Sequence, residues 1–166
     1  MNDFFSLNYI MPIGCKNISF SIQVGYTDAE NEYKKHTLSA LIDTGATRSA
    51  ISKCLACKLG LIRTGKALEA GATGLYGTVL YNIDVIFDDV KIIKNIEISE
   101  VYEGIGDDFI IGMDILTLGD VAITNMDGRI LFSFRIPHNE KVIHFGREQK
   151  QIEANICYYC GHPLKE

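Results

Sequence analysis

Apolar side chains recur at every second position over long parts of this chain, and that period of two is the feature that most restricts its fold. In residues 18–26, apolar side chains alternate with small or polar ones, which places the apolar set on one face of a half-buried strand. The pattern returns in residues 81–87 and at Ile96 and Ile98, after a turn at residues 88–89. The middle of the chain is therefore predicted to be a β-meander.

A further hairpin is predicted near the end of the periodic region. The apolar runs 121–124 and 129–134 lie on either side of Asp127 and Gly128, a pair that favours the positive φ angles of a tight turn. Helical signals are few and short by comparison. The expected fold class is therefore all-β.

Two short helices and one uncertain segment complete the prediction. Ser52 can cap a helix over residues 53–59, and Gly60 is placed to end it in the left-handed conformation. A second short helix is expected to follow Asp114. The polar residues 146–156 form either a last helix or a mobile arm.

Length and composition indicate one compact domain, residues 1–137, followed by a C-terminal arm, residues 138–166. Of the 166 residues, 47% are apolar and 22% charged, as in ordinary globular proteins. The net charge of −5 argues against nucleic acid as a partner, since phosphate binding depends on clustered cations. Without a long apolar run or a signal peptide, we expect no membrane partner and a cytoplasmic location. Because the cytoplasm is reducing, the five cysteines of the chain are expected to be free thiols.

The most informative segment is an apolar strand that ends in Asp43, Thr44 and Gly45. Such a strand end presents a carboxylate, while Thr44 can hydrogen-bond locally and Gly45 permits a turn that side chains would obstruct. The alternative is a turn or capping acid without chemistry. A second apolar run, residues 109–116, contains Gly112, which would let the backbone approach the Asp43 loop without a Cβ in the way.

Together these two segments resemble the retropepsin-like aspartic peptidases, the single-domain family that includes retroviral proteases, over roughly residues 9–137. The resemblance implies an acid-protease-like closed β-barrel or sandwich with one lobe per chain. It also implies that Asp43 is the catalytic carboxylate. The residues that would support its loop are Thr44, Gly45, Ala46 and Gly112.

The family also has a Gly-rich hairpin that closes over the substrate, and residues 69–77 are the comparable stretch here. The alternative is an ordinary flexible loop. Tyr76 would either hydrogen-bond in the closed flap or pack its ring on the sheet. The residues implied as flap and substrate-binding residues are Gly71, Ala72, Thr73, Gly74 and Tyr76.

One chain carries a single Asp-Thr-Gly, so a catalytic pair of acids requires a second copy of Asp43 from a homodimer. The resemblance then implies an aspartic endopeptidase that acts on peptide or protein substrates through a water held between two Asp43 carboxylates. Self-processing is a further possibility within this class. The alternative function is a non-catalytic, dimeric peptide-binding or adaptor module. Asp114 is expected to orient its helix and to stay outside the chemistry.

Two departures from the retroviral pattern and one tail motif remain. An ion pair of the viral enzymes is replaced here by Thr47 and Met113, where packing is expected to take over and the dimer interface to differ. No cofactor is expected, except that the tail holds half of a zinc knuckle. The alternative for the tail is a frayed terminus without metal. Cys54 and Cys57 could supply further ligands, and their alternative is packing as small apolar groups. The candidate zinc ligands are Cys157, Cys160 and His162.

Overall fold

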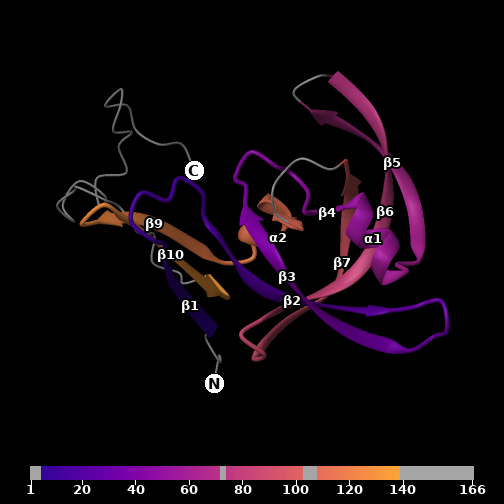
Figure 1. The fold of residues 1–166 in the computed structure, drawn as a ribbon, viewed down its shortest axis with the longest axis horizontal. Helices are drawn as coiled ribbons and strands as arrows, with labels where there is room; N and C mark the ends of the chain where they lie inside the picture. Colours follow the sequence, from indigo (N-terminus) through magenta and orange to yellow (C-terminus); the bar gives the residue numbers. More distant parts are fainter. Residues whose placement is uncertain (1–4, 72–73, 103–107, 139–166) are drawn as a thin grey trace, which may run out of the picture.

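The computed structural model describes residues 5–71, 74–102 and 108–138, most of which lie in strands (Figure 1). The elements are, in chain order, β1 (Phe5–Ile10), β2 (Ser19–Thr27), β3 (Tyr33–Ile42), β4 (Ala50–Ser52), α1 (Lys53–Leu59), β5 (Arg63–Gly71), β6 (Gly74–Phe87), β7 (Lys91–Val101), β8 (Phe109–Ile111), α2 (Met113–Leu116), β9 (Asp120–Met126) and β10 (Arg129–Ile136). The all-β prediction with short helices is confirmed. Apart from His138, the predicted arm lies outside the described residues, so the domain boundary stays a prediction.

Most strands close into a barrel. In the described residues the larger sheet has the order β2-β3-β8-β4-β7-β6-β5, and an additional pairing of β2 with β6 closes the first six of these strands into a ring. β5 stays outside the ring and, among the strands that the structure describes, pairs with β6 alone. The β5–β6 hairpin consequently extends beyond the barrel, at the upper right of Figure 1. The closed barrel that the family resemblance implied is confirmed.

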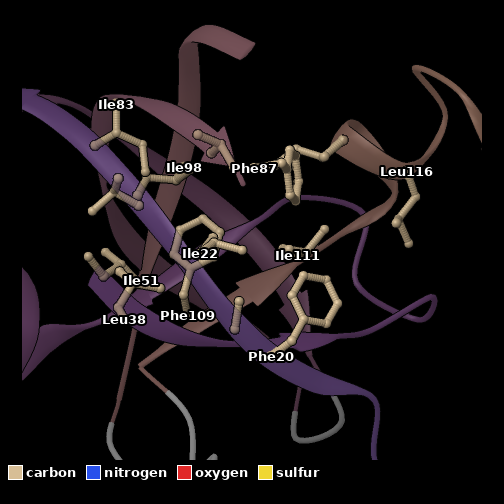
Figure 2. Packing of buried hydrophobic residues seen from close by; sticks show 14 of the residues in the cluster. Phe20, Ile22, Leu38, Ile51, Ile83, Phe87, Ile98, Phe109, Ile111 and Leu116 are labelled. Atoms are coloured by element: carbon tan, nitrogen blue, oxygen red, sulfur yellow. The ribbon is translucent and has the colours of Figure 1, made fainter. Parts of the chain in front are cut away.

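The core of this barrel is built from apolar side chains of the alternating segments together with those of the two apolar runs that precede Asp43 and Gly112. Ile22 on β2, Leu38 on β3 and Phe109 and Ile111 on β8 pack together in Figure 2. Phe109 and Ile111 have no exposed surface. Burying one such side chain contributes about 1.5–3 kcal/mol, so the period of two determines which strand face turns inward.

A smaller sheet of β1, β10 and β9 packs beside the barrel. Its first strand was not predicted, although Phe5, Leu7 and Tyr9 alternate with polar residues and all pack on the core side. The Tyr9 ring stacks on Phe20 of β2, with ring centroids 4.0 Å apart. These aromatic contacts join the two sheets into one core.

The turns follow the predicted chemistry. Asp127 and Gly128 have φ angles of 52° and 74° and connect Met126 to Arg129, which is a two-residue hairpin turn of the type that requires two positive φ angles. The predicted turn at residues 88–89 also has positive φ at both positions. Both hairpins of the prediction are therefore confirmed.

The helix α1 begins and ends as predicted. The Ser52 hydroxyl accepts a hydrogen bond from the Leu55 N–H, and Gly60 ends the helix at φ 66°. Cys54 and Cys57 differ from the packed state considered for them, because both are exposed free thiols on the outer face of α1. Within the described residues, neither helix has the length and apolar character needed to cross a membrane.

Candidate active site

Asp43 directly follows β3, where that strand runs parallel to β8. Ile42 pairs with Ile111, and the Asp43 N–H donates to the Ile111 carbonyl at 3.0 Å. One oxygen of the half-buried Asp43 carboxylate accepts the Gly45 N–H at 2.8 Å, and the Ala46 N–H donates to the Asp43 carbonyl at 3.2 Å. These backbone hydrogen bonds therefore hold the loop as a tight turn and fix the orientation of the Asp43 carboxylate.

Gly112 lies against this loop with no room for a side chain. A Cβ at this position would lie 2.7 Å from the Arg48 carbonyl carbon and 2.9 Å from the Ala46 carbonyl oxygen. The next residue, Met113, donates its N–H to the same Ala46 oxygen at 2.8 Å. The second apolar segment thus packs directly against the Asp43 loop, as expected from the absence of a side chain at Gly112.

Ser49 and Asp114 connect the loop to α2 by hydrogen bonds. The fully buried Ser49 hydroxyl donates to one Asp114 oxygen at 2.7 Å, and the Ser49 N–H donates to the other at 2.9 Å. The same hydroxyl accepts the Gly112 N–H at 3.0 Å. Met113 packs against the core, in line with the expectation of packing where the viral enzymes have an ion pair, and the Ser49–Asp114 hydrogen bonds beside it form a polar link that was not predicted.

A cavity of about 480 Å³ lies between the Asp43 loop and the β5–β6 hairpin. Asp43, Gly45 and Ala46 line it from the loop, while Gly71 and Tyr76 line it from the hairpin. The Tyr76 ring lies across Gly71, where an added Cβ would approach a ring carbon to 2.9 Å. The predicted flap segment is thus a β-hairpin that faces the Asp43 carboxylate across a solvent-accessible space.

The other flap and loop residues named from the sequence have different positions. Thr44 is exposed and is absent from the cavity lining. Gly74 begins β6 at φ 118°, a conformation that L side chains rarely adopt, but it does not line the cavity either. In the described residues the Tyr76 hydroxyl makes no hydrogen bond. Ala72 and Thr73 lie outside the described residues.

Sequence reasoning missed three charged residues beside the cavity. The Arg48 Nε lies 3.2 Å from a Glu69 carboxylate oxygen, and its Nη1 forms an ion pair with Glu97 on β7. Together with Asp43, Arg48 and Glu69 are the charged residues that line the cavity within the described part of the chain. Their partners lie on distant strands, so no local pattern could have revealed the cluster.

A group of acids at the β2–β3 turn is the one described cluster with metal-ligand spacing, and it has another role. Asp28 accepts the N–H groups of Glu30 and Glu32, both at 3.0 Å, which closes the turn. The Lys34 ammonium forms ion pairs with Asp28 and Glu32 and lowers the pKa of Asp28 below its ordinary value. These contacts account for the cluster without a metal ion. The residues named for a tail zinc site lie outside the described residues: Cys157, Cys160 and His162.

Comparison with known proteins links this geometry to a family. A model of the family described as gag-polyprotein putative aspartyl protease matches residues 29–117, more than half of the chain. The match includes the Asp43 loop, the β5–β6 hairpin and Gly112. No curated protein matches.

Two solved structures are similar to this chain. A retropepsin-like aspartic protease from Rickettsia conorii is 19% identical with a TM-score of 0.45, and the match covers 81% of this chain and 95% of that one. The retroviral protease-like domain of Ddi1 from Leishmania major is 16% identical with a TM-score of 0.40, over 68% and 91% of the two chains.

Proposed function

This chain belongs to the retropepsin-like gag-polyprotein aspartyl protease family, and we propose that it is an aspartic endopeptidase that is active as a homodimer. The observation that carries the proposal is the position of Asp43. Its carboxylate lies at the end of a core strand, is oriented by the Gly45 N–H and lines a cavity that a β-hairpin faces from the other side. A turn-capping acid would need no such cavity.

The proposed reaction requires two carboxylates, and one chain supplies a single Asp-Thr-Gly. A two-fold axis that brings a second Asp43 within about 3 Å would give a pair that cannot readily ionise twice, so the two acids would share one proton. A shared proton is the general property of aspartic protease dyads, so it follows here from the proposed class of enzyme. The apparent pKa values would belong to the pair.

Each member of that pair has a distinct task. The ionised carboxylate accepts a proton from a bound water, which attacks the peptide carbonyl, while the protonated carboxyl group donates to the carbonyl oxygen. A proton then passes to the leaving amine as the C–N bond breaks. The Gly45 N–H contact would keep Asp43 in one orientation through both proton transfers.

An extended peptide is the substrate class that suits the cavity. In the described residues β5 pairs with β6 alone, so the other edge of β5 offers unpaired backbone groups beside the cavity. A peptide that binds along such an edge adds a strand and places alternate side chains toward the protein. The proposal is therefore cleavage within extended protein segments.

The first test compares cleavage of an unbiased peptide mixture by the parent, by Asp43→Asn and by Asp127→Asn. Asp127 is exposed in the β9–β10 turn, and Asn tolerates its positive φ, so this variant controls for an equivalent chemical change away from the site. We expect product peptides from the parent and Asp127→Asn, and essentially none from Asp43→Asn. Equal, negligible cleavage by all three would favour the peptide-binding module instead.

A mixing experiment tests the dimer. If one active site needs two Asp43 carboxylates, then parent chains equilibrated with an excess of Asp43→Asn chains will mostly form mixed pairs that lack one acid. Activity per parent chain should fall in proportion to the parent fraction. Unchanged activity per parent chain would show that one chain is sufficient. Intact-mass measurement over the same incubation would reveal self-processing.

A further inference from the structure

We propose that Arg48 is a positioning residue that holds the β5–β6 hairpin over Asp43 through its ion pair with Glu69. The inference deepens the proposed peptidase function and rests on it for its role in the reaction. Arg48 contacts the hairpin, whereas Asp43 performs the chemistry, so Arg48 would act on the reaction only through the hairpin. Three structural features support this assignment. The backbone of Arg48 is fixed, the β5–β6 hairpin has few other contacts with the barrel, and the Arg48 side chain bridges two acids.

The backbone of Arg48 is fixed by its neighbours. The Arg48 carbonyl group lies so close to Gly112 that a Cβ there would come within 2.7 Å of it. The following residue, Ser49, is fully buried and bonded to Asp114 through both its N–H and its hydroxyl. An arginine whose carbonyl group and following residue are both held in place can act as a rigid point of attachment.

The hairpin has few other attachments. β6 pairs with β7 only from Leu80 onward, and beyond that ladder the Thr78 hydroxyl donates to the Glu100 carbonyl at 2.7 Å and accepts the Glu100 N–H at 3.1 Å. Residues 74–77 lie beyond these contacts and pair with β5. β5 pairs with no other strand in the described residues. A two-stranded ribbon of this kind is only marginally stable by itself, so a contact to the barrel is needed to set its position.

Arg48 makes that contact from between two acids. Its side chain is 32% exposed, that of Glu69 on β5 is 18% exposed, and that of Glu97 on β7 is 51% exposed. The two contacts differ in kind. The Arg48 Nη1 donates a hydrogen bond to Glu97, whereas the Glu69 oxygen that lies 3.2 Å from Nε accepts no hydrogen bond in the described residues, so Glu69 is held by charge attraction. Partial burial also reduces the screening that makes surface ion pairs weak.

The Arg48–Glu69 contact determines which hairpin side chains face Asp43 across the cavity. Glu69 is directly opposite Tyr76 in the hairpin register, and Arg48, Glu69, Tyr76 and Asp43 all line the same cavity. An ion pair that fixes Glu69 on Arg48 therefore also fixes the position of the Tyr76 ring in the cavity that Asp43 lines. Without this pair, the hairpin would be free to swing outward and the cavity would lose one wall.

Hydrogen exchange measured by mass spectrometry tests this role without any need for activity. In an Asp43→Asn background, which avoids self-cleavage, we expect Glu69→Gln to speed exchange in residues 63–79 by about five-fold, on the scale of one ion pair. Lys66→Gln is the matched control, because Lys66 is exposed on the same strand. Glu97→Gln should leave the hairpin as protected as in the parent, since Arg48 keeps Glu69.

Kinetics then tests the consequence for peptide cleavage. Arg48→Gln and Glu69→Gln should each raise KM several-fold with a smaller change in kcat, and the double variant should be no worse than either single one. Arg48→Lys should lie between the parent and Arg48→Gln. A merely structural role would instead reduce the fraction of folded enzyme and leave KM unchanged.

Two results would overturn the proposal. One is equal hairpin exchange in Glu69→Gln and Lys66→Gln, and the other is faster exchange in Glu97→Gln that matches Glu69→Gln, which would indicate general loosening. The peptidase function fails by a different observation, namely a parent that cleaves no peptide. Because exchange is measured in an inactive background, the two failures are distinguishable.

Discussion

Replacing Gly112 by alanine should displace the Asp43 loop, because the added methyl group would collide with backbone atoms only. A Cβ at Gly112 would lie 2.7 Å from the Arg48 carbonyl carbon and 2.9 Å from the carbonyl oxygens of both Ala46 and Arg48. Gly112 itself has φ −93° and ψ −174°, which any residue adopts. The cost of the substitution is therefore steric and does not arise from backbone strain.

The contacts set the size of the effect. Backbone atoms cannot rotate away as a side-chain end can, so the loop must move by about 0.5–0.7 Å to restore ordinary van der Waals contact. Overpacking of this kind costs about 1–3 kcal/mol, and we expect a value near the upper end, about 3 kcal/mol. Since a misplacement of about 1 Å can cost on the order of 100-fold in rate, the cleavage rate should fall by at least about 10-fold.

Urea unfolding and peptide cleavage measure the two consequences. Gly77→Ala is the control for stability, because no atom lies within 4 Å of its would-be Cβ and its φ is not positive. We expect a lower unfolding midpoint for Gly112→Ala and an unchanged one for Gly77→Ala. A Gly112→Ala protein with the parent's midpoint and cleavage rate would refute the view that the two segments touch beneath Asp43.

Three further predictions concern other parts of the molecule. Ser49→Ala should lower the free energy of unfolding by about 2 kcal/mol, because Asp114 loses a buried donor, and an unchanged urea midpoint would contradict this. Burial first, and then a hydrogen bond to a glutamate, raise the pKa of Tyr81 to about 12, so stability should fall as pH rises from about 10 to 12, and less so in Tyr81→Phe. If stability depends on pH in the same way in Tyr81→Phe as in the parent, the loss of stability at high pH does not arise from this tyrosine. If the half zinc knuckle of the tail holds zinc instead of being a frayed terminus, elemental analysis should find metal that is lost when Cys157 and Cys160 are both replaced by serine.

Local chemistry was enough to predict several elements of the fold. Ser52 and Gly60 mark the two ends of α1 because a hydroxyl can satisfy a free N–H and glycine adopts positive φ without strain. Asp127 and Gly128 define their hairpin for a similar reason. β1 was missed although its alternation is present, since six residues near a chain end give a weak signal.

The Asp43 loop and the Gly112 segment could also be recognised from the sequence, since each depends on residues that follow one another along the chain. The cavity beside them could not. Ser49 meets Asp114, and Arg48 meets Glu69 and Glu97, only after strands far apart in sequence have paired.

Side-chain period and turn residues act over a few positions and are therefore written directly in the sequence. Contacts between distant charged groups depend on how the barrel closes, through the β2–β6 pairing and the parallel approach of β3 to β8. The sequence thus determined several of the strands, their turns and the acid at a strand end. Only the tertiary structure decided which hairpin faces that acid and which ion pair holds it there, because such contacts are set by geometry across the whole sheet.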